Sequence, residues 1–161
     1  MLTHVDETTG RAAMVDVSDK AITRRTASAR SIVEVGPEIL QQLSAGDIQT
    51  KKGPVFQTAI IAGTMGAKRT SELIPLCHPI GLDNCNIDII INPDQQIQID
   101  CTTTVTSKTG VEMEALTGAS IAALTIYDMC KAMSHDIVIL ETKLMAKTGG
   151  KSEYRRSEEQ S

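Results

Sequence analysis

The chain has 161 residues, a net charge of -4 and only three aromatic side chains, one Phe and two Tyr. Proteins that bind nucleic acid use basic surfaces and stacking aromatic rings, so this composition argues against a nucleic-acid partner. No apolar run approaches the roughly 20 residues of a membrane span. The polar N-terminus lacks the apolar segment of a secretory signal, so we expect a cytoplasmic protein without a membrane partner.

The hydrophobic pattern predicts one domain over residues 1–161, with a core built from aliphatic side chains. Strict alternation from Ile97 to Val105 is typical of a half-buried strand, and Asn92-Pro93-Asp94 before it is typical of a hairpin turn. The expected elements are an extended N-terminal arm over 1–27, a strand over 29–35, a helix over 38–44, a loop over 47–54, a helix over 55–69, strands over 85–91 and 96–106, a helix over 111–133, a strand over 137–145, a glycine-containing loop over 147–152 and a flexible charged tail over 153–161.

If one helix is an insertion, this order reduces to β-α-β-β-α-β. That order predicts an α+β fold of the ferredoxin-like (split βαβ) type, with an antiparallel sheet and helices packed on one face. The other face of such a sheet is left open, and both long helices are rich in small residues. We therefore expect a homo-oligomer that covers the surplus surface.

The four cysteines form no C-x-x-C pair. A zinc site has little support from such spacing, and a disulfide framework is unusual in a cytosolic chain of this size. We expect all four to serve as small buried hydrophobic residues.

Cationic side chains concentrate in loops that contain glycine. The segment Lys147–Ser152 combines two lysines with Gly149-Gly150, whose backbone N–H groups can approach an anion, so it favours a phosphate site over a merely solvated surface. His78 lies between Cys77 and Pro79 in a rigid stretch. It is either a structural residue or a group that contacts an anion or transfers a proton.

Two groups of charged residues lie on the predicted helix over 111–133. Glu112 and Glu114 at its start either complement the helix dipole or bind a ligand. Asp128 and Lys131 are three residues apart in an apolar stretch, so they form either a surface ion pair or an acid–base pair. In the second case, desolvation is expected to lower the pKa of Lys131 toward neutrality. No set of metal ligands is present, and the pattern favours a phosphate-bearing small molecule handled by acid–base chemistry without a redox cofactor.

Five motifs in this order resemble the cyclic pyranopterin monophosphate synthase family of molybdenum cofactor biosynthesis, over about residues 3–152. They are Met14–Ser18 with Lys20, Leu73–Pro79, Lys108–Leu116, Ala123–Lys131 and Lys147–Ser152. The resemblance implies a ferredoxin-like hexamer, a trimer of dimers with active sites at subunit interfaces. It implies a lyase that converts 3′,8-cyclo-7,8-dihydroguanosine 5′-triphosphate into cyclic pyranopterin monophosphate and diphosphate, with no metal or organic cofactor.

The resemblance also implies residue roles. Lys131 would be the catalytic acid or base, with Asp128 orienting it. The implied substrate-binding residues are Leu76, Cys77, His78, Glu112, Met113, Glu114, Lys52 and Lys68, and the implied phosphate-binding residues are Lys20, Arg25, His78, Lys147 and Lys151.

The chain departs from the family pattern at Pro54, Gly118 and Glu153, and His135 matches no pattern position. None of these departures removes a catalytic candidate. A carboxylate at Glu153 would repel phosphate at the edge of the predicted loop. Two alternatives stay open: a non-catalytic nucleotide-sensing oligomer, and an RNA-binding module on the same topology.

Overall fold

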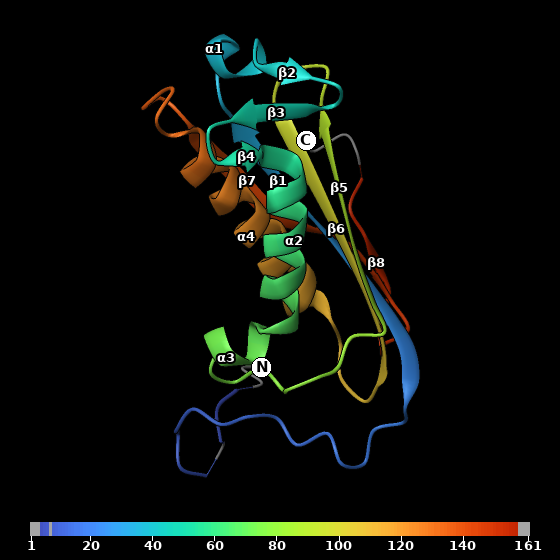
Figure 1. The fold of residues 1–161 in the computed structure, drawn as a ribbon. Coiled ribbons are helices and arrows are strands. Elements are labelled where there is room, and N and C mark those ends of the chain that lie inside the picture. Colours follow the sequence, from blue (N-terminus) through green and yellow to red (C-terminus); the bar gives the residue numbers. More distant parts are fainter. Residues whose placement is uncertain (1–3, 7, 158–161) are drawn as a thin grey trace.

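The computed structural model describes residues 4–6 and 8–157. Its main feature is one antiparallel sheet with the strand order β5-β6-β1-β7-β8 (Figure 1). The strands are β1 (Thr23–Glu34), β5 (Asn84–Ile91), β6 (Ile97–Ser107), β7 (Val138–Thr148) and β8 (Tyr154–Arg155). The expected hairpin of two strands around residue 93 is present as β5 and β6.

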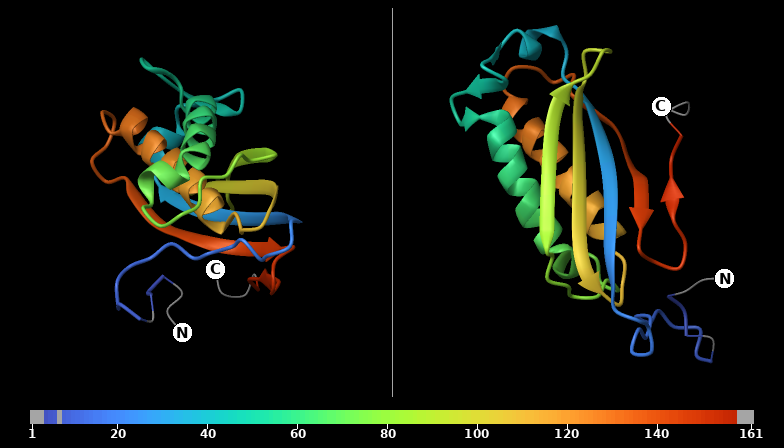
Figure 2. Two further views of the ribbon diagram at one scale, coloured as in Figure 1. Left: turned by 90° about the horizontal axis from the view of Figure 1, so that it is seen from below. Right: turned by 90° about the vertical axis from the view of Figure 1, so that its right-hand side faces the viewer.

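Two long helices lie on the same face of this sheet (Figure 2). They are α2 (Val55–Lys68) and α4 (Glu112–Cys130). The minor elements are α1 (Pro37–Leu40), α3 (Thr70–Leu73) and a small sheet of β2 (Leu43–Ser44), β3 (Asp47–Thr50) and β4 (Gly53–Pro54). The predicted α+β architecture, an antiparallel sheet with helices packed against it, is confirmed. Within residues 4–6 and 8–157, no helix is long and apolar enough to cross a membrane.

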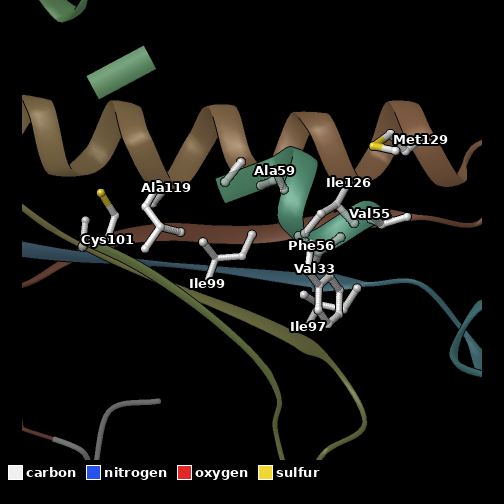
Figure 3. Close-up of a cluster of buried hydrophobic side chains, with 14 of the residues drawn as sticks. Val33, Val55, Phe56, Ala59, Ile97, Ile99, Cys101, Ala119, Ile126 and Met129 are labelled. Carbon is white, nitrogen blue, oxygen red and sulfur yellow. The ribbon is translucent and has the colours of Figure 1, made fainter. Parts of the chain in front are cut away.

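The core fills the space between the sheet and the two helices (Figure 3). The predicted alternation along β6 is confirmed, because Ile97, Ile99 and Cys101 are completely buried. On α4 the small side chains of Ala119 and Ala123 are also completely buried. Small residues on the helix let its axis approach the sheet closely, so aliphatic strand residues fill the core with little help from aromatic rings.

Glycines bring the two long helices together. A Cβ atom at Gly63 of α2 would lie 2.7 Å from the carbonyl oxygen of Gly118 on α4, and one at Gly118 would lie 2.6 Å from the sulfur of Cys101. Real Cβ atoms do not come so close to other atoms, so these positions accept no side chain without movement. The departure from the family pattern at Gly118 thus lies within the helix packing.

Several predicted boundaries are wrong. The strand β1 begins at Thr23, so residues 23–27 of the expected arm belong to the sheet, and β7 continues to Thr148. Both extensions are mostly polar. They are held by backbone pairing with neighbouring strands, such as Thr26 with Thr104 and Thr148, and this pairing does not depend on hydrophobic side chains. The expected tail also contributes β8.

The segment between β1 and α2 also differs from the prediction. The helix expected over 38–44 ends at Leu40, and the loop expected over 47–54 contains β3 and β4. The helix expected over 111–133 ends at Cys130, with Lys131 as its C-cap.

One buried carboxylate that the sequence pattern did not single out organises this region. Asp47 accepts hydrogen bonds from the backbone N–H of Phe56 at 2.7 Å and of Gln57 at 3.1 Å. These donors lie in the first turn of α2 and have no partner within the helix. Asp47 therefore anchors the start of α2 from a distance in sequence, which spacing rules for helix caps do not detect.

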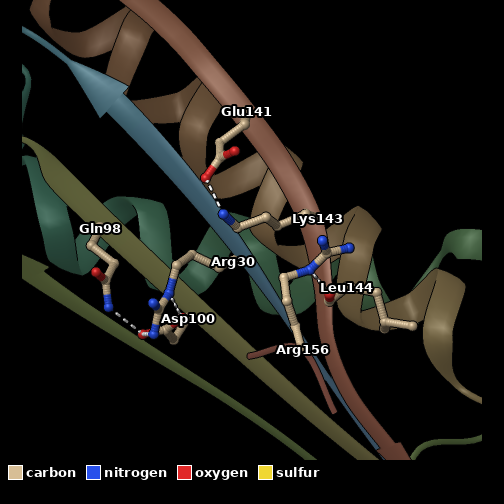
Figure 4. A network of polar contacts seen from close by, with 7 residues as sticks. All are labelled: Arg30, Gln98, Asp100, Glu141, Lys143, Leu144 and Arg156. Carbon is tan, nitrogen blue, oxygen red and sulfur yellow. Dashed lines mark hydrogen bonds and ion pairs between the residues drawn. The ribbon is translucent and has the colours of Figure 1, made fainter. Parts of the chain in front are cut away.

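The face of the sheet away from the helices carries charged side chains (Figure 4). Arg30 pairs with Asp100 at 2.7 Å, and Lys143 pairs with Glu141 at 2.7 Å. Isolated ion pairs of this kind contribute little to stability.

Candidate functional site

A pocket of about 410 Å³ opens between the N-terminal arm, the start of α4 and the turn after β7. All five residues expected to hold phosphate line this pocket: Lys20, Arg25, His78, Lys147 and Lys151. They come from four separate parts of the chain, which the fold brings together.

Hydrogen bonds hold the N-terminal arm over the pocket. The Nε2 of His78 donates to the carbonyl oxygen of Val15 at 2.8 Å, and the ammonium group of Lys108 donates to the carbonyl oxygen of Ser18 at 2.6 Å. The arm therefore forms one wall of the pocket, and His78 both supports that wall and lines the cavity.

The turn after β7 is pressed against β1. Gly149 has a φ of 83°, and a Cβ atom there would lie 2.0 Å from the carbonyl oxygen of Arg24. Its own carbonyl accepts a hydrogen bond from the Thr23 hydroxyl at 2.7 Å. The positive φ and the lack of space for a Cβ atom both require a glycine at this position. The expected loop over 147–152 is corrected in one respect, since Lys147 lies in β7 and only the residues after Thr148 form the turn.

A smaller pocket of about 140 Å³ adjoins the first. Its lining includes six of the expected substrate-binding residues: Leu76, Cys77, His78, Glu112, Met113 and Glu114. His78 and Glu112 line both pockets. A ligand with a phosphate chain and a polar ring can thus place the two parts in adjoining spaces.

Glu112 and Glu114 differ in their surroundings. Glu112 pairs with Lys147 at 3.1 Å. Glu114 is only 4% exposed, and burial raises its pKa to about 7, with a further contribution from the nearby charge of Glu112. Glu114 can therefore hold or release a proton near neutral pH.

A second cluster lies at the other end of the molecule, where β4 meets the last turn of α4 (Figure 1). The Asp128 carboxylate pairs with Lys52 at 2.9 Å and with Lys131 at 2.8 Å. The hydrogen bonds from Lys131 and Lys52 hold the pKa of Asp128 near 2.

The prediction that Lys131 is desolvated and has a lowered pKa is wrong for the single chain. Its side chain is 57% exposed, and the hydrogen bond to Asp128 raises its pKa instead of lowering it toward neutrality. The apolar neighbours in the sequence point to the core, because Met129 and Cys130 lie on the buried side of the helix. The charged pair occupies the opposite, solvent-facing side.

The two clusters are far apart in one chain. Glu112 opens α4 and Asp128 lies in its last turn, which corresponds to about 24 Å along the helix axis at 1.5 Å per residue. Lys68 lies at the end of α2, where it is exposed and lines neither pocket. Glu153 and His135 are also exposed, and neither of them lines either pocket.

Two further observations qualify the predictions. His4 lines both pockets, although it lies in no motif. The only feature of the sequence that could have drawn attention to it is that histidine is rare in this chain, with three in all. Of the four cysteines, Cys101 and Cys130 are buried as expected, whereas Cys77 and Cys85 are half-buried, and Cys77 faces the smaller pocket.

The fold and the site define an α+β protein with a cation-lined pocket at one end and an Asp–Lys cluster at the other. Comparison with protein families identifies it more closely. The MoaC family model matches residues 14–150, and the chain belongs to the MoaC family.

Individual relatives agree with this assignment. The chain is 54% identical over 150 residues to a cyclic pyranopterin monophosphate synthase of Xanthomonas axonopodis pv. citri, with 93% of this chain and 90% of the relative covered. It is 53% identical over 151 residues to a protein of the same name from Desulfitobacterium hafniense, with 94% and 91% covered. It is also 54% identical over 155 residues to molybdenum cofactor biosynthesis protein 1 of Dictyostelium discoideum. That match covers 86% of this chain but only 25% of the much longer relative.

Proposed function

We propose that this protein is a lyase of molybdenum cofactor biosynthesis that converts 3′,8-cyclo-7,8-dihydroguanosine 5′-triphosphate into cyclic pyranopterin monophosphate and diphosphate. The observation that carries the proposal is the gathering of five cationic or histidine side chains, which the family resemblance implied as phosphate ligands, around one pocket. The names of the bacterial relatives, which match over about nine-tenths of their length, support the same reaction.

The phosphate chemistry accounts for the pocket. Forming a cyclic monophosphate from a triphosphate breaks the bond between the α phosphorus and the oxygen that bridges it to the β phosphorus, while a hydroxyl oxygen of the same molecule bonds to the α phosphorus and gives up its proton to a base. The diphosphate leaves with the electron pair of the broken bond and gains negative charge. Cations such as Arg25 and Lys147 beside the pocket stabilise that charge as it develops.

The ring of the substrate would occupy the smaller pocket. Carboxylates accept hydrogen bonds from the N–H groups of a guanine-derived ring, and Glu112 and Glu114 line this space. Glu114, with its pKa near 7, is suited to exchange protons with the ring.

Rearranging the purine ring into a pterin requires proton transfers at several atoms. We assign these to Lys131 as acid or base, with Asp128 orienting it and Lys52 holding Asp128 from the other side. In the single chain the exposed Lys131 stays protonated at neutral pH, since its pKa is raised. Covering Lys131 with a protein surface would remove water and lower that pKa, so that Lys131 could both donate and accept a proton near neutral pH.

A second copy of the chain supplies that cover. One chain keeps Asp128 about 24 Å from Glu112, too far for both to touch one nucleotide. The outer face of the helix layer exposes large apolar side chains, including Ile61 at 62% and Leu124 at 54%. Exposed apolar surface of this kind is typical of an interface between subunits.

A twofold axis near Ile121, the middle of α4, would pair two copies of this helix in antiparallel orientation. Asp128 of one copy would then lie beside the partner copy's Glu114, because 121 is midway between 114 and 128. Such a dimer completes two sites from the two clusters. The hexamer implied by the family, a trimer of such dimers, needs one further contact.

We also assign the domain to the ferredoxin-like type, as one unit over residues 1–161. The sheet order β5-β6-β1-β7, with α2 after β1 and α4 after β6, supports the β-α-β-β-α-β arrangement. The four cysteines are free thiols, as is usual in a reducing compartment, which supports a cytoplasmic location.

The proposal is tested by incubating the purified protein with the cyclic nucleotide and measuring released diphosphate and the pterin product. Turnover that disappears in Lys131→Ala, with assembly and unfolding temperature retained, is the expected result. Binding of the nucleotide without turnover would favour the nucleotide-sensing alternative. Wild-type turnover in both Lys131→Ala and Asp128→Asn would contradict the residue assignment.

A further inference from the structure

The larger pocket contains its own negative charge. Glu112 is the only carboxylate among the described residues that line it, and its Oε1 lies 3.1 Å from the ammonium nitrogen of Lys147. Both side chains are about one-third exposed, 31% for Glu112 and 33% for Lys147. In the protein without ligand, one of the cations expected to bind phosphate is therefore already paired.

The position of this carboxylate depends on the residue two places before it. A Cβ atom at Gly110 would lie 2.0 Å from Oε2 of Glu112. A glycine at 110 thus leaves the space that the carboxylate occupies. A side chain at position 110 would require the Glu112 carboxylate to move from this position.

Glu112 also lines the smaller pocket, together with Glu114 and Met113. A ligand that fills both pockets meets Glu112 from two directions. Its phosphate competes with Glu112 for Lys147, while N–H donors of its ring can satisfy the carboxylate that Lys147 leaves. A bare phosphate chain separates the same ion pair and gives Glu112 no new donor, so a partly exposed carboxylate loses its ion-pair partner.

We propose that Glu112 is a specificity-determining residue: it holds Lys147 in the empty site and gives it up only to a phosphate chain whose attached ring supplies N–H donors in exchange. This inference rests on the proposed function, since it concerns the same site. Its consequence is that the protein binds inorganic polyphosphate, and the diphosphate product, more weakly than its cations alone would allow. Weak binding of the product favours its release.

The test compares the affinities of inorganic tripolyphosphate and GTP, measured by titration calorimetry without turnover. Glu112→Gln keeps the shape of the side chain and removes its charge. We expect it to bind tripolyphosphate about threefold to tenfold more tightly, the range of one partly exposed ion pair. The same variant is expected to bind GTP no more tightly than wild type, because it loses an acceptor for the ring.

Glu153→Gln is the matched control. It removes the same charge from an exposed residue near the pocket that does not line it. The inference requires that the tripolyphosphate affinity change less in Glu153→Gln than in Glu112→Gln. It also requires that Glu153→Gln change the affinities of tripolyphosphate and GTP by the same factor. A second control repeats Glu112→Gln in a Lys147→Met background, where the tightening should largely disappear, because the pair is already broken.

Three results would overturn the inference: unchanged tripolyphosphate affinity in Glu112→Gln, equal tightening for tripolyphosphate and GTP, or the same tightening with and without Lys147. Absence of tripolyphosphate binding by both the wild-type protein and Glu112→Gln would overturn it as well. The readout is an affinity and not a rate. Normal turnover with no change in tripolyphosphate affinity rejects this inference alone, whereas the expected affinities without turnover reject only the proposed reaction.

Discussion

The ammonium group of Lys52 donates a hydrogen bond to the Asp128 carboxylate at 2.9 Å, although 76 positions separate the two residues. It also donates to the backbone carbonyl oxygen of Asp128 at 3.2 Å. The segment between β3 and β4 is thereby tied to the last turn of α4. Asp128 is held between two lysines, which fixes the direction of its carboxylate toward Lys131.

Replacing Lys52 with Met should reduce turnover by up to about 10²- to 10⁴-fold, the usual contribution of the general acid or base whose partner Asp128 it positions. The unfolding temperature should change little, since the Lys52 side chain is 54% exposed. The matched control is Lys51→Met, which removes the same charge from an exposed neighbour. Equal losses of turnover in the two variants would show that only the local charge matters, and the proposed role of Lys52 would be rejected.

A site shared between subunits predicts that two inactive variants complement each other. Lys131→Ala damages the cluster at the end of α4, and His78→Ala damages the pockets at its start. After unfolding and refolding together in equal amounts, the mixture should recover about a quarter of wild-type activity, because a quarter of randomly formed sites combine two intact halves. Recovery no greater than the sum of the separately refolded variants would mean that each site lies within one chain.

Glu114 should make the stability of the protein depend on pH. Its pKa is about 7 in the folded chain against 4.5 for an ordinary glutamate, because burial disfavours the charged form. The folded state therefore binds more protons between these values, and the free energy of unfolding falls as pH rises from about 4.5 to 7, by about 3 kcal/mol at most for this group.

Glu114→Gln removes that contribution and should become more stable than wild type as pH rises through this window, with the difference constant above about pH 7. Urea unfolding at several pH values measures it. Glu34→Gln, at an exposed position, is the control and should follow the wild-type curve. A Glu114→Gln curve parallel to wild type throughout would mean that Glu114 ionises normally.

The contact between α2 and α4 predicts that Gly63→Ala is destabilising. A Cβ atom at Gly63 would meet the carbonyl oxygen of Gly118 at 2.7 Å and the side chain of Ala122 at 3.1 Å. We expect a loss of about 1–3 kcal/mol in the free energy of unfolding, as for other overpacked cores. In the control Gly81→Ala the added methyl group meets nothing within 4 Å. A stability equal to that of the control would show that the helices separate without cost.

Much of the architecture follows from local patterns. Alternating residues along Ile97–Val105 predict the strand β6, and the spacing of small and apolar residues predicts α2 and α4. These predictions succeed because each element has one face against the core, and that face imposes its period on the sequence. The pattern fails at Thr23–Ser28 and at Asp47–Pro54, where backbone pairing holds largely polar segments in place.

Local residue chemistry identifies part of the candidate site, since lysines beside glycines and a histidine in a rigid proline-containing stretch are typical of anion sites, whereas residues such as Lys20 and Arg25 are expected only from the resemblance to a known family. The arrangement of these residues could not be predicted from the sequence. Lys20, His78 and Lys147 meet around one pocket because the antiparallel sheet brings distant segments to the same end of the molecule. Asp128 and Lys131 face solvent and lie far from that pocket because α4 is straight and its apolar side is turned to the core. Charge and residue type are thus properties of the sequence, whereas distance and exposure, which decide what those charges can do, arise only from packing.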